Sequence, residues 1–394
     1  MPAAPLPEYD LTATTLFGLE EVLAEELRQL GAQEVQVATR AVSFRGNLRL
    51  VYRANLWCRT AIRILRPFAS FRARDEQELY RKVSSVDWSD YLDVSQTLLI
   101  NSVVSQSTFE HSLYVSQLAK DAIVDQFRKR YGERPSVDVL RPDIRLNLHM
   151  HENQVTLSLD SSGDSLHRRG YRLQTNVAPL NEVLAAGLVL LTGWDGKRPF
   201  VDPMCGSGTL VAEAAMISCR IAPGLYRKDF AFMRWKDYDP ALYRQVYQEA
   251  MSQETAGEGA LIIGSDIDKD YLQAARQNLE NAELENYVDL QVADIREFIP
   301  PEAPGVVVTN PPYGERIIPS DLNNLYRQIG DSLKTNFQGY DAYVFTGNLE
   351  AAKHIGLKTS RRIPLYNGKI ECRLLKYELY RGSRKGGSGG EAMG

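Results

Sequence analysis

Four polar side chains with hydrogen-bonding chemistry stand directly after short apolar stretches in the second half of the chain. They are Asp202, Asp266, Asp294 and Asn310. The apolar stretches are typical of buried strands, and helical patterns lie between them. Because ligands bind beyond the carboxyl ends of the strands in a parallel α/β sheet, we expect the carboxylates and the carboxamide to meet at one edge. The sequence therefore predicts a doubly wound α/β fold with a ligand site along that edge.

A glycine-rich turn follows the first of these strands, in the sequence Asp202-Pro203-Met204-Cys205-Gly206-Ser207-Gly208-Thr209. Gly206 and Gly208 lack a Cβ atom, so the backbone can turn sharply and a ligand can approach closely. Apolar residues at helical spacing come next, and the first amides of that helix would face the ligand. The pattern indicates a loop for a nucleotide-type cofactor, although similar turns also occur without a ligand. Asp266 comes later than the roughly 20 residues of a simple dinucleotide fingerprint, because residues 220–259 look like a helical insertion.

Together with Asn310-Pro311-Pro312-Tyr313, these features resemble the class I S-adenosylmethionine-dependent methyltransferases that act on exocyclic amino groups. The resemblance implies S-adenosyl-L-methionine as cofactor, with Asp266 on the ribose hydroxyls and Asp294 on the adenine amino group. Asp202 and the amides of residues 205–208 would hold the methionine end. The residues expected to bind the cofactor are Asp202, Pro203, Cys205, Gly206, Gly208, Thr209, Asp266, Ile267, Asp294 and Asn310. We interpret Cys205 as a packing residue and not as a nucleophile.

The same resemblance assigns catalysis to Asn310, Pro311 and Tyr313. The amino group of a base is a poor nucleophile because its lone pair is delocalised into the ring. Hydrogen bonds from that amine to the Asn310 side-chain oxygen and the Pro311 carbonyl would favour the pyramidal form, most strongly in the transition state. Tyr313 would stack on a base rotated out of its helix. Taken alone, the tetrapeptide also fits a proline-stiffened loop, and it does not distinguish adenine N6, cytosine N4, guanine N2 or glutamine N5.

The composition is that of an ordinary globular chain, with 394 residues of which 44% are hydrophobic and 24% charged. This length allows two or three domains of roughly 100–200 residues each. No apolar run reaches the roughly 18 residues of a membrane span, and the first residues do not look like a secretory signal. The four cysteines and five histidines are scattered, so we expect neither a disulfide framework nor a metal site. We expect a cytoplasmic protein without membrane or metal partners, and a monomer.

The charge is unevenly distributed along the chain. The net charge of −4 argues against indiscriminate binding of polyanions. Residues 45–82, however, contain ten basic and only three acidic side chains, which is typical of a phosphate-binding surface. The alternative is that these arginines pair with acids elsewhere in the fold.

The chain divides into several expected segments. Residues 1–8 look like a disordered lead, 9–60 a small α+β domain, 50–160 a second α+β domain, 161–180 a linker, 181–380 the α/β domain, and 381–394 a disordered Gly/Ser tail. The first two domains resemble the ferredoxin-like plus THUMP arrangement of some RNA-modifying enzymes. The residues that carry this resemblance include Leu16-Phe17-Gly18-Leu19-Glu20-Glu21 and Pro142-Asp143-Ile144-Arg145.

In that arrangement the N-terminal half grips RNA and holds the catalytic domain at one distance from its target. The basic side chains expected to contact RNA are Arg63, Arg66, Lys120, Arg168, Arg169, Arg172 and Arg316. Arg168, Arg169 and Arg172 belong to a polar, glycine-punctuated segment for which a simple linker is the alternative interpretation.

As a whole, residues 9–380 resemble the guanine-N2 methyltransferases of 23S ribosomal RNA. They are most similar to the N-terminal half of the fused bacterial enzyme, methyltransferase L, without its guanine-N7 methyltransferase half. This implies methylation of a guanine N2 in 23S ribosomal RNA, free or in a pre-ribosomal particle. A transfer-RNA guanine-N2 enzyme of the same layout is the first alternative, and a non-catalytic RNA-binding assembly factor is another. A DNA adenine-N6 or protein glutamine-N5 methyltransferase would need a different recognition domain, and the basic N-terminal half argues against it.

Overall fold

The protein, described here by a computed structural model, forms two compact units. The structure describes residues 6–172, 180–255, 259–313 and 321–380. Unit 1 contains the chain up to Arg169 together with Ala222–Ser252, and unit 2 contains Gly170–Ile221 and the chain from Gln253 onward. The expected Gly/Ser tail at 381–394 and residues 1–5 of the expected lead lie outside the described residues. Glu8, the last residue of that lead, already begins strand β1.

A single eight-stranded sheet runs through unit 1, in the order β2-β3-β1-β4-β8-β7-β5-β6. The strands are β1 (Glu8–Thr15), β2 (Gln33–Ala38), β3 (Ala41–Asn47), β4 (Ala61–Arg72), β5 (Thr97–Ser105), β6 (Ser136–Val137), β7 (Ile144–His151) and β8 (Gln154–Asp160). The 12-residue strand β4 pairs with β1 through its first part and with β8 from Leu65 onward. One long strand thus joins the two N-terminal domains that the sequence predicts.

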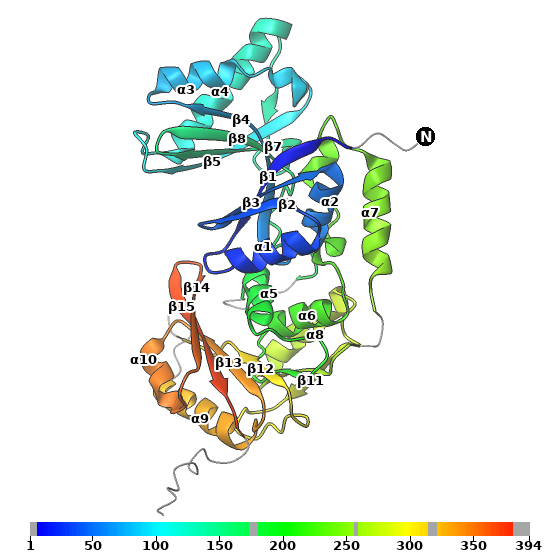
Figure 1. Cartoon of the computed structure of the whole chain (residues 1–394), viewed down its shortest axis with the longest axis vertical. Helices are drawn as coiled ribbons and strands as arrows, with labels where there is room; N and C mark the ends of the chain where they lie inside the picture. The colour runs from blue at the N-terminus through cyan, green and yellow to red at the C-terminus, as the bar shows by residue number, and fades with distance from the viewer. Residues whose placement is uncertain (1–5, 173–179, 256–258, 314–320, 381–394) are drawn as a thin grey trace, which may run out of the picture. The chain divides into compact units, whose positions relative to one another are not determined.

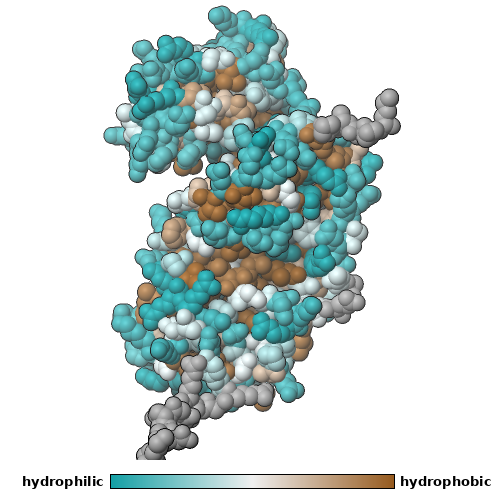
Figure 2. Space-filling view, in the orientation of Figure 1, coloured by the Kyte–Doolittle hydropathy of each residue, from teal (hydrophilic) through white to brown (hydrophobic). Residues whose placement is uncertain are grey.

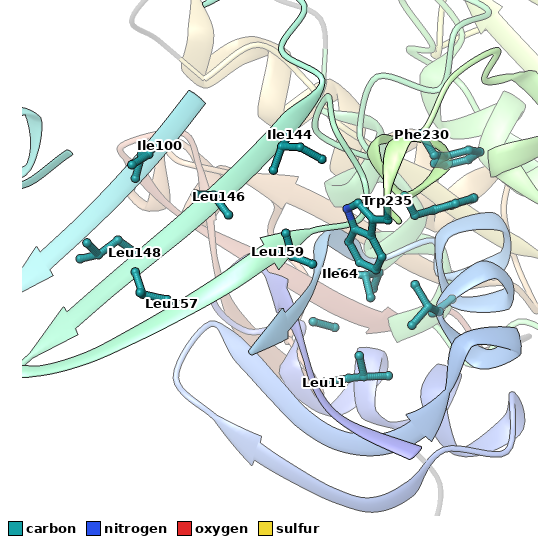
Figure 3. Packing of buried hydrophobic residues seen from close by; sticks show 14 of the residues in the cluster. Leu11, Ile64, Ile100, Ile144, Leu146, Leu148, Leu157, Leu159, Phe230 and Trp235 are labelled. Carbon is teal, nitrogen blue, oxygen red and sulfur yellow. The ribbon is translucent and has the colours of Figure 1, made fainter. Parts of the chain in front are cut away.

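Four α-helices cover this sheet within the N-terminal part of unit 1. They are α1 (Glu20–Gln29), α2 (Leu48–Trp57), α3 (Glu76–Ser84) and α4 (Ser112–Tyr131), with a short 3-10 turn at Trp88–Asp90. The side chains of Asn47 and Asp75 cap α2 and α3 by accepting bonds from backbone amides of the first turn, which satisfies otherwise unpaired donors. Apolar residues of the strands pack together beneath the helices, as Figure 3 shows for Leu146, Leu148 and Leu157.

The predicted helical insertion is confirmed, and it packs against unit 1. It consists of the 3-10 turns Pro223–Tyr226 and Ala231–Arg234 and helix α7 (Pro240–Ser252). Figure 1 shows α7 beside α2, although nearly 200 residues separate them in the sequence. The buried Tyr52 ring of α2 lies 4.6 Å from the Phe232 ring and 5.5 Å from the Tyr243 ring. Aromatic side chains bury large apolar areas, so this cluster fastens the insertion to α2.

Residues 161–169, the strap, are also held within unit 1. The hydroxyl of Ser161 donates to the Ile64 carbonyl over 2.7 Å, and that of Ser162 donates to the Asn55 side chain over 2.7 Å. The half-buried guanidinium of Arg227, from the insertion, donates to four strap carbonyls. These are the carbonyls of Ser162 (3.0 Å), Asp164 (2.9 Å), Ser165 (3.1 Å) and Arg168 (2.8 Å). The sequence predicts a linker over 161–180, but residues 161–169 are ordered and hydrogen-bonded within unit 1. Residues 173–179 lie outside the described ranges.

Unit 2 contains the predicted doubly wound α/β sheet, which is confirmed. Its strands are β9 (Phe200–Asp202), β10 (Ile262–Asp266), β11 (Val288–Val292), β12 (Val306–Thr309), β13 (Asp341–Thr346), β14 (Arg361–Asn367) and β15 (Ile370–Glu378). They lie in the order β11-β10-β9-β12-β13-β15-β14. The first five are parallel, and β15 runs antiparallel to both of its neighbours. The strand order reverses between β9 and β12, and such a switch point is where open α/β sheets bind ligands.

Helices cover both faces of this sheet. They are α5 (Glu182–Leu191), α6 (Thr209–Ser218), α8 (Lys269–Asn281), α9 (Leu322–Thr335) and α10 (Leu349–Ala352), followed by a 3-10 turn at Lys353–Ile355. Figure 1 shows α5, α6 and α8 on one side of the strands and α9 and α10 on the other. Across the described ranges of both units, no helix has the length and apolar composition that a membrane crossing requires.

Substitution of Gly224 by alanine should destabilise unit 1. An added Cβ at Gly224 would lie 2.6 Å from the Leu56 Cα and 2.7 Å from the Asn55 carbonyl oxygen, both backbone atoms of α2. Overpacking of this kind typically costs about 1–3 kcal/mol, so urea unfolding should show a loss of that size. Gln248→Ala, at an exposed position of α7, is the control and should change stability by less than about 0.5 kcal/mol. Equal stability of the two variants would contradict the packing of the insertion on α2.

Candidate active site

Strand pairing brings the predicted site residues to one edge of the unit 2 sheet. Gly264 of β10 pairs with Asp202, so Asp266 lies two residues beyond it. Val307 of β12 pairs with Val201, and β12 ends at Thr309, directly before Asn310. Parallel strands end at the same edge. The acids and the carboxamide therefore gather at the switch point between β9 and β12, as the sequence predicts.

The glycine turn is shaped by left-handed backbone conformations and by hydrogen bonds to β10. Gly206 and Gly208 have φ angles of 53° and 81°, which side chains rarely allow. The amide of Gly206 donates to the Asp266 carboxylate over 2.9 Å, and the Cys205 amide donates to the Ser265 carbonyl over 2.8 Å. A Cβ at Gly208 would lie 3.0 Å from the Ala275 Cβ of α8. The turn is thus fixed before any ligand arrives.

Asp202 is the most strongly perturbed acid of the site. Its side chain is 1% exposed, and this burial raises the pKa of its carboxyl group to about 8, with the nearby Asp266 carboxylate adding to the effect. The amide of Met204, which donates to Asp202 over 3.2 Å, opposes the shift. Burial also raises the pKa of Asp266. Two carboxyl groups that are costly to ionise together form a place where a cation would be favoured.

The Cys205 side chain is buried against strand β10. Burial raises the pKa of its thiol well above the usual value, and the charges of Asp202 and Asp266 act in the same direction. The Sγ atom lies 3.2 Å from the position of a Cβ at Gly264, so the thiol fills space against β10. A neutral thiol is a weak nucleophile, which agrees with the predicted packing role.

The remaining predicted cofactor residues lie at the ends of β10 and β11. Asp294 accepts hydrogen bonds from the Arg296 side chain at 3.0 Å and 2.5 Å, and these bonds lower the pKa of the Asp294 carboxyl group. Ile267 follows Asp266 directly, and its side chain is 67% exposed. A large, solvent-exposed apolar side chain next to Asp266 offers a surface on which a flat ring could pack.

The acceptor atom of Asn310 is buried and unpaired. Within the described residues its Oδ1 atom has no hydrogen-bond partner. A buried polar atom without a partner costs free energy, and such groups call for a functional explanation. This oxygen stands ready to accept a hydrogen bond from a ligand.

Two tyrosines brace the loop that carries Asn310. The Tyr326 hydroxyl of α9 donates to the Pro312 carbonyl over 3.3 Å and lies 2.6 Å from the Thr346 hydroxyl oxygen. The Tyr313 hydroxyl accepts a hydrogen bond from the Asn367 amide over 2.7 Å. No local sequence pattern marks Tyr326 or Thr346 as part of the site, because both act through contacts that only the fold creates. Residues 314–320, which include the predicted RNA contact Arg316, lie outside the described ranges.

Arg172 lies in unit 2 in a buried polar network that the sequence did not reveal. Its guanidinium donates to the Thr209 hydroxyl over 2.6 Å and to the Leu180 carbonyl over 3.1 Å. The buried Glu182 carboxylate lies 3.5 Å away. An RNA contact was predicted for Arg172, but its burial and partners favour a role in holding the start of α6. The one sequence feature that could have indicated this network is Glu182, the only charged residue of the otherwise apolar helix α5.

The other predicted RNA contacts lie in unit 1, and several of their side chains point inward. Arg66 lies over the rings of Tyr9 and Trp235 and donates to Asp237. Arg169 is 2% exposed and donates to backbone carbonyls. Arg66 thus pairs with an acid elsewhere in the fold, which is the alternative stated for residues 45–82, and Arg169 is held inside unit 1 by backbone carbonyls. Arg63 bonds to Asp160 and Lys120 pairs with Asp121, whereas the Arg168 side chain is 70% exposed.

Fold and site together define an S-adenosylmethionine-type α/β methyltransferase domain joined to an α+β N-terminal unit. The chain belongs to the RMKL-like methyltransferase family, whose model matches residues 169–376. An RlmL ferredoxin-like domain matches residues 10–65, and a THUMP domain matches residues 73–160. Within the described residues no group of three or more acidic, histidine or cysteine side chains is placed to hold a metal ion.

Individual relatives agree with this assignment. The chain is 44% identical to slr0064 of Synechocystis sp., a candidate RNA methyltransferase, over 93% of this chain and 96% of that one. It is 45% identical to the ribosomal RNA large subunit methyltransferase K/L of Syntrophotalea carbinolica, over 93% of this chain and 53% of that one. The chain thus spans about half the length of the K/L relatives. The structure of SMU.472, a candidate methyltransferase in complex with SAH, superimposes with a TM-score of 0.86 at 32% identity, covering 95% of this chain and 99% of that one.

Substitution of Asp202 by asparagine should flatten the pH dependence of stability in unit 2. Because burial raises the pKa of Asp202 to about 8, the folded state holds a proton that the unfolded state releases. The ligand-free protein should lose stability as the pH rises towards 8, by at most about 1.4 kcal/mol per pH unit for this one proton. Asp202→Asn should remove that slope, measured by urea unfolding with hydrogen exchange of β10 peptides. Asp289→Asn, at an exposed position of β11, should keep the wild-type slope, and an unchanged slope in Asp202→Asn would contradict the burial effect.

Proposed function

We propose that this chain transfers the methyl group of S-adenosyl-L-methionine to the exocyclic N2 amine of a guanine in 23S ribosomal RNA. The observation that carries the proposal is the buried, unpaired Asn310 Oδ1 atom at the switch point, beside the glycine turn, the buried Asp202 and the half-buried Asp266. The K/L relatives, named as ribosomal RNA large subunit methyltransferases, support the choice of RNA. A cytoplasmic protein that meets free 23S RNA or a pre-ribosomal particle fits this substrate.

The residues at the edge fit the cofactor. S-adenosyl-L-methionine, when bound, supplies an activated methyl group on a positively charged sulfur. Asp202 would favour the positive charges of its methionine part, the amides of the glycine turn would approach its carboxylate, and Asp266 would accept hydrogen bonds from its ribose hydroxyls. A cation held there would stabilise the ionised form of Asp202, whose pKa burial otherwise raises to about 8. Ile267 would pack against the adenine ring, and Asp294 would accept from its amino group.

Asn310 and Pro311 would act on the acceptor amine. The Asn310 Oδ1 atom and the Pro311 carbonyl accept hydrogen bonds from the two N–H groups of the amine. These bonds turn its lone pair out of conjugation and strengthen as positive charge develops on the nitrogen. The nitrogen afterwards gives up one proton to water. Tyr326 and the two prolines hold the acceptors in place, so the site needs little rearrangement in the transition state.

Substitution of Asn310 by alanine should abolish turnover while leaving cofactor binding nearly intact. One lost acceptor of this kind typically costs about 100- to 1000-fold in kcat. The test compares methyl transfer from labelled cofactor to 23S RNA with cofactor affinity from calorimetry. Asn286→Ala, at an exposed position outside the site, should leave both unchanged. A parallel loss of turnover and cofactor affinity in Asn310→Ala would contradict the role assigned to its side chain.

The target is tested by removing the gene. Ribosomal and transfer RNA from a deletion strain should be digested and examined by mass spectrometry for N2-methylguanosine. The expected result is loss of one such nucleoside from 23S RNA, restored by the wild-type gene and not by the Asn310→Ala variant. Loss from transfer RNA instead would make the alternative substrate the correct one. An unchanged content in both RNAs, together with no methyl transfer in vitro, would favour a non-catalytic assembly factor.

A further inference from the structure

Three basic side chains of helix α4 are paired with acids of the same surface. Arg130 bonds to Asp87 over 2.8 Å and Arg128 to Asp125 over 3.0 Å, and Lys120 pairs with Asp121. Figure 2 shows hydrophilic side chains over most of this part of unit 1. Exposed pairs of this kind leave little net charge for a polyanion. These three side chains are therefore poor candidates for a phosphate contact.

The opposite face of the sheet is different in its charge. Arg145 of β7 lies on this face, with Asn147, His149 and His151 following at alternate positions. The neighbouring strands add uncharged or basic side chains at the paired positions of this face, namely Ser158, Thr156 and Gln154 of β8 and Ser70 and Arg72 of β4. Between Arg145 and the end of β7, the described residues of this face in β4, β7 and β8 include no carboxylate. Such a face can accept a polyanionic backbone without repulsion.

Arg145, at the base of this face, makes no short side-chain hydrogen bond or ion pair within the described residues. The residue is 9% exposed, and its Nε atom has no hydrogen-bond partner within the described residues. Its ion pair with Asp164 measures 3.8 Å, which is too long for a hydrogen bond. Burial lowers the pKa of the Arg145 guanidinium, the Asp160 charge opposes this shift, and the nearby Arg63 charge adds to it. A buried guanidinium without short bonds is costly, unless a ligand completes it.

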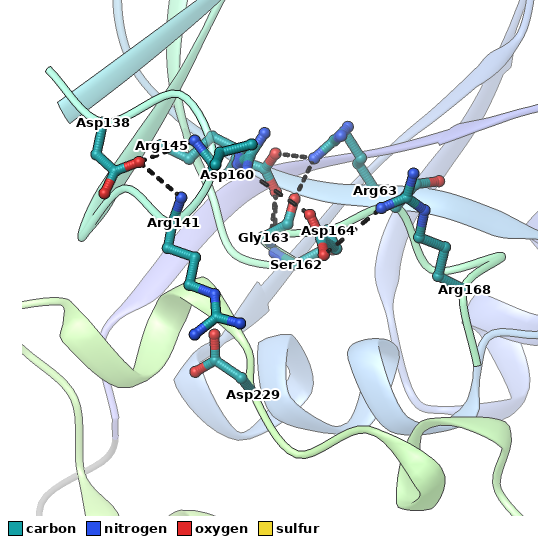
Figure 4. A network of polar contacts seen from close by, with 12 residues as sticks. Arg63, Asp138, Arg141, Arg145, Asp160, Ser162, Gly163, Asp164, Arg168 and Asp229 are labelled. Atoms are coloured by element: carbon teal, nitrogen blue, oxygen red, sulfur yellow. Dashed lines mark hydrogen bonds and ion pairs between the residues drawn. The ribbon is translucent and has the colours of Figure 1, made fainter. Parts of the chain in front are cut away.

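The neighbouring acid Asp160 does not fill this gap. Asp160 bonds to the Arg63 guanidinium and accepts from the amides of Ser162 at 2.9 Å and Gly163 at 3.3 Å. Asp160 therefore makes its short bonds to groups other than Arg145, although the charges of these two side chains still interact. Figure 4 shows these groups together, with Asp164 joined by dashed lines to the arginines on either side.

Asp164 occupies the space between Arg145 and Arg168 only loosely. Its carboxylate lies 3.8 Å from Arg145 and 3.9 Å from Arg168, and the Asp164 and Arg168 side chains are 58% and 70% exposed. A phosphate is larger than a carboxylate and carries more acceptor oxygens, so it could bond both guanidinium groups at short distance. We propose that a backbone phosphate of the RNA substrate binds between Arg145 and Arg168, where the Asp164 carboxylate lies in the free protein. The proposal rests on RNA being the substrate and adds the place where unit 1 holds it.

Removing the Asp164 charge should tighten RNA binding. If Asp164 had only a structural role, its removal would not raise the affinity for RNA. Binding of an in vitro 23S RNA transcript is measured by fluorescence anisotropy across a series of salt concentrations. Asp164→Asn should lower Kd about threefold or more, because the phosphate no longer competes with a fixed anion. Glu25→Gln is the matched control, since Glu25 is also exposed and lies 3.6 Å from an arginine, Arg28. An unchanged or raised Kd in Asp164→Asn would overturn the proposal.

Removing the Arg168 charge should have the opposite effect. Arg168→Gln should weaken binding about fivefold and reduce the slope of log K against log salt by roughly 0.7–0.9, the contribution of one phosphate contact. Arg28→Gln should leave the slope unchanged. Both variants change exposed side chains, so thermal stability should stay at the wild-type value, whereas Arg145→Gln would remove a buried cation and confuse binding with folding. An unaltered slope in Arg168→Gln would also count against the site.

The outcome separates this inference from the proposed function. If the wild type binds and methylates 23S RNA but Asp164→Asn and Arg168→Gln behave like their controls, the phosphate site is wrong and the activity stands. If the variants shift RNA affinity as expected but no N2-methylguanosine is formed, the site stands and the proposed reaction is wrong.

Discussion

The parallel pairing of β9 with β10 and β12 is the constraint on which the chemistry of this protein depends. Each strand brings one polar group to its carboxyl end, and only parallel alignment delivers those groups to the same edge. The order of strands reverses there, so neighbouring loops diverge and leave room for a ligand. Gly206 and Gly208 then allow the backbone itself to line the space. A shift in strand register would move Asp202 and Asn310 apart and leave no site.

Burial gives these groups their electrostatic character. Asp202 is held where its charge is unfavourable without a cation nearby, and the Asn310 oxygen is held where it lacks a partner without a donor nearby. Both features make the ligand-free unit less stable. A bound cation near Asp202 and a hydrogen-bond donor to Asn310 would remove this destabilisation. This is a common arrangement in sites that stabilise developing charge by preorganised polar groups. Tyr326 and Asn367 supply the rigidity that preorganisation needs.

The local features of the site could be read from the sequence, whereas its long-range support could not. The glycine turn, the strand-end acids and Asn310-Pro311-Pro312-Tyr313 are compact motifs whose chemistry is visible in a few consecutive residues. Arg66 and Arg169 look like surface cations in a basic stretch, yet the fold turns them towards Asp237 and backbone carbonyls. Nothing near them in the sequence reveals those partners, which come from distant segments. The packing of residues 222–252 on α2 could not be predicted either, because the pattern of an amphipathic helix does not identify the surface that it covers.

That docking interleaves the two units along the chain. The core of unit 1 needs Phe232 and Tyr243 to cover Tyr52, and these residues are synthesised only after β9 and α6 of unit 2. The N-terminal unit therefore cannot complete its core while the ribosome is still making the first part of the catalytic unit. Nor can the halves be separated by a single cut at Arg169, since one fragment would lose its aromatic cover and the other would carry that cover exposed to water. The two units therefore depend on an uncut polypeptide to fold.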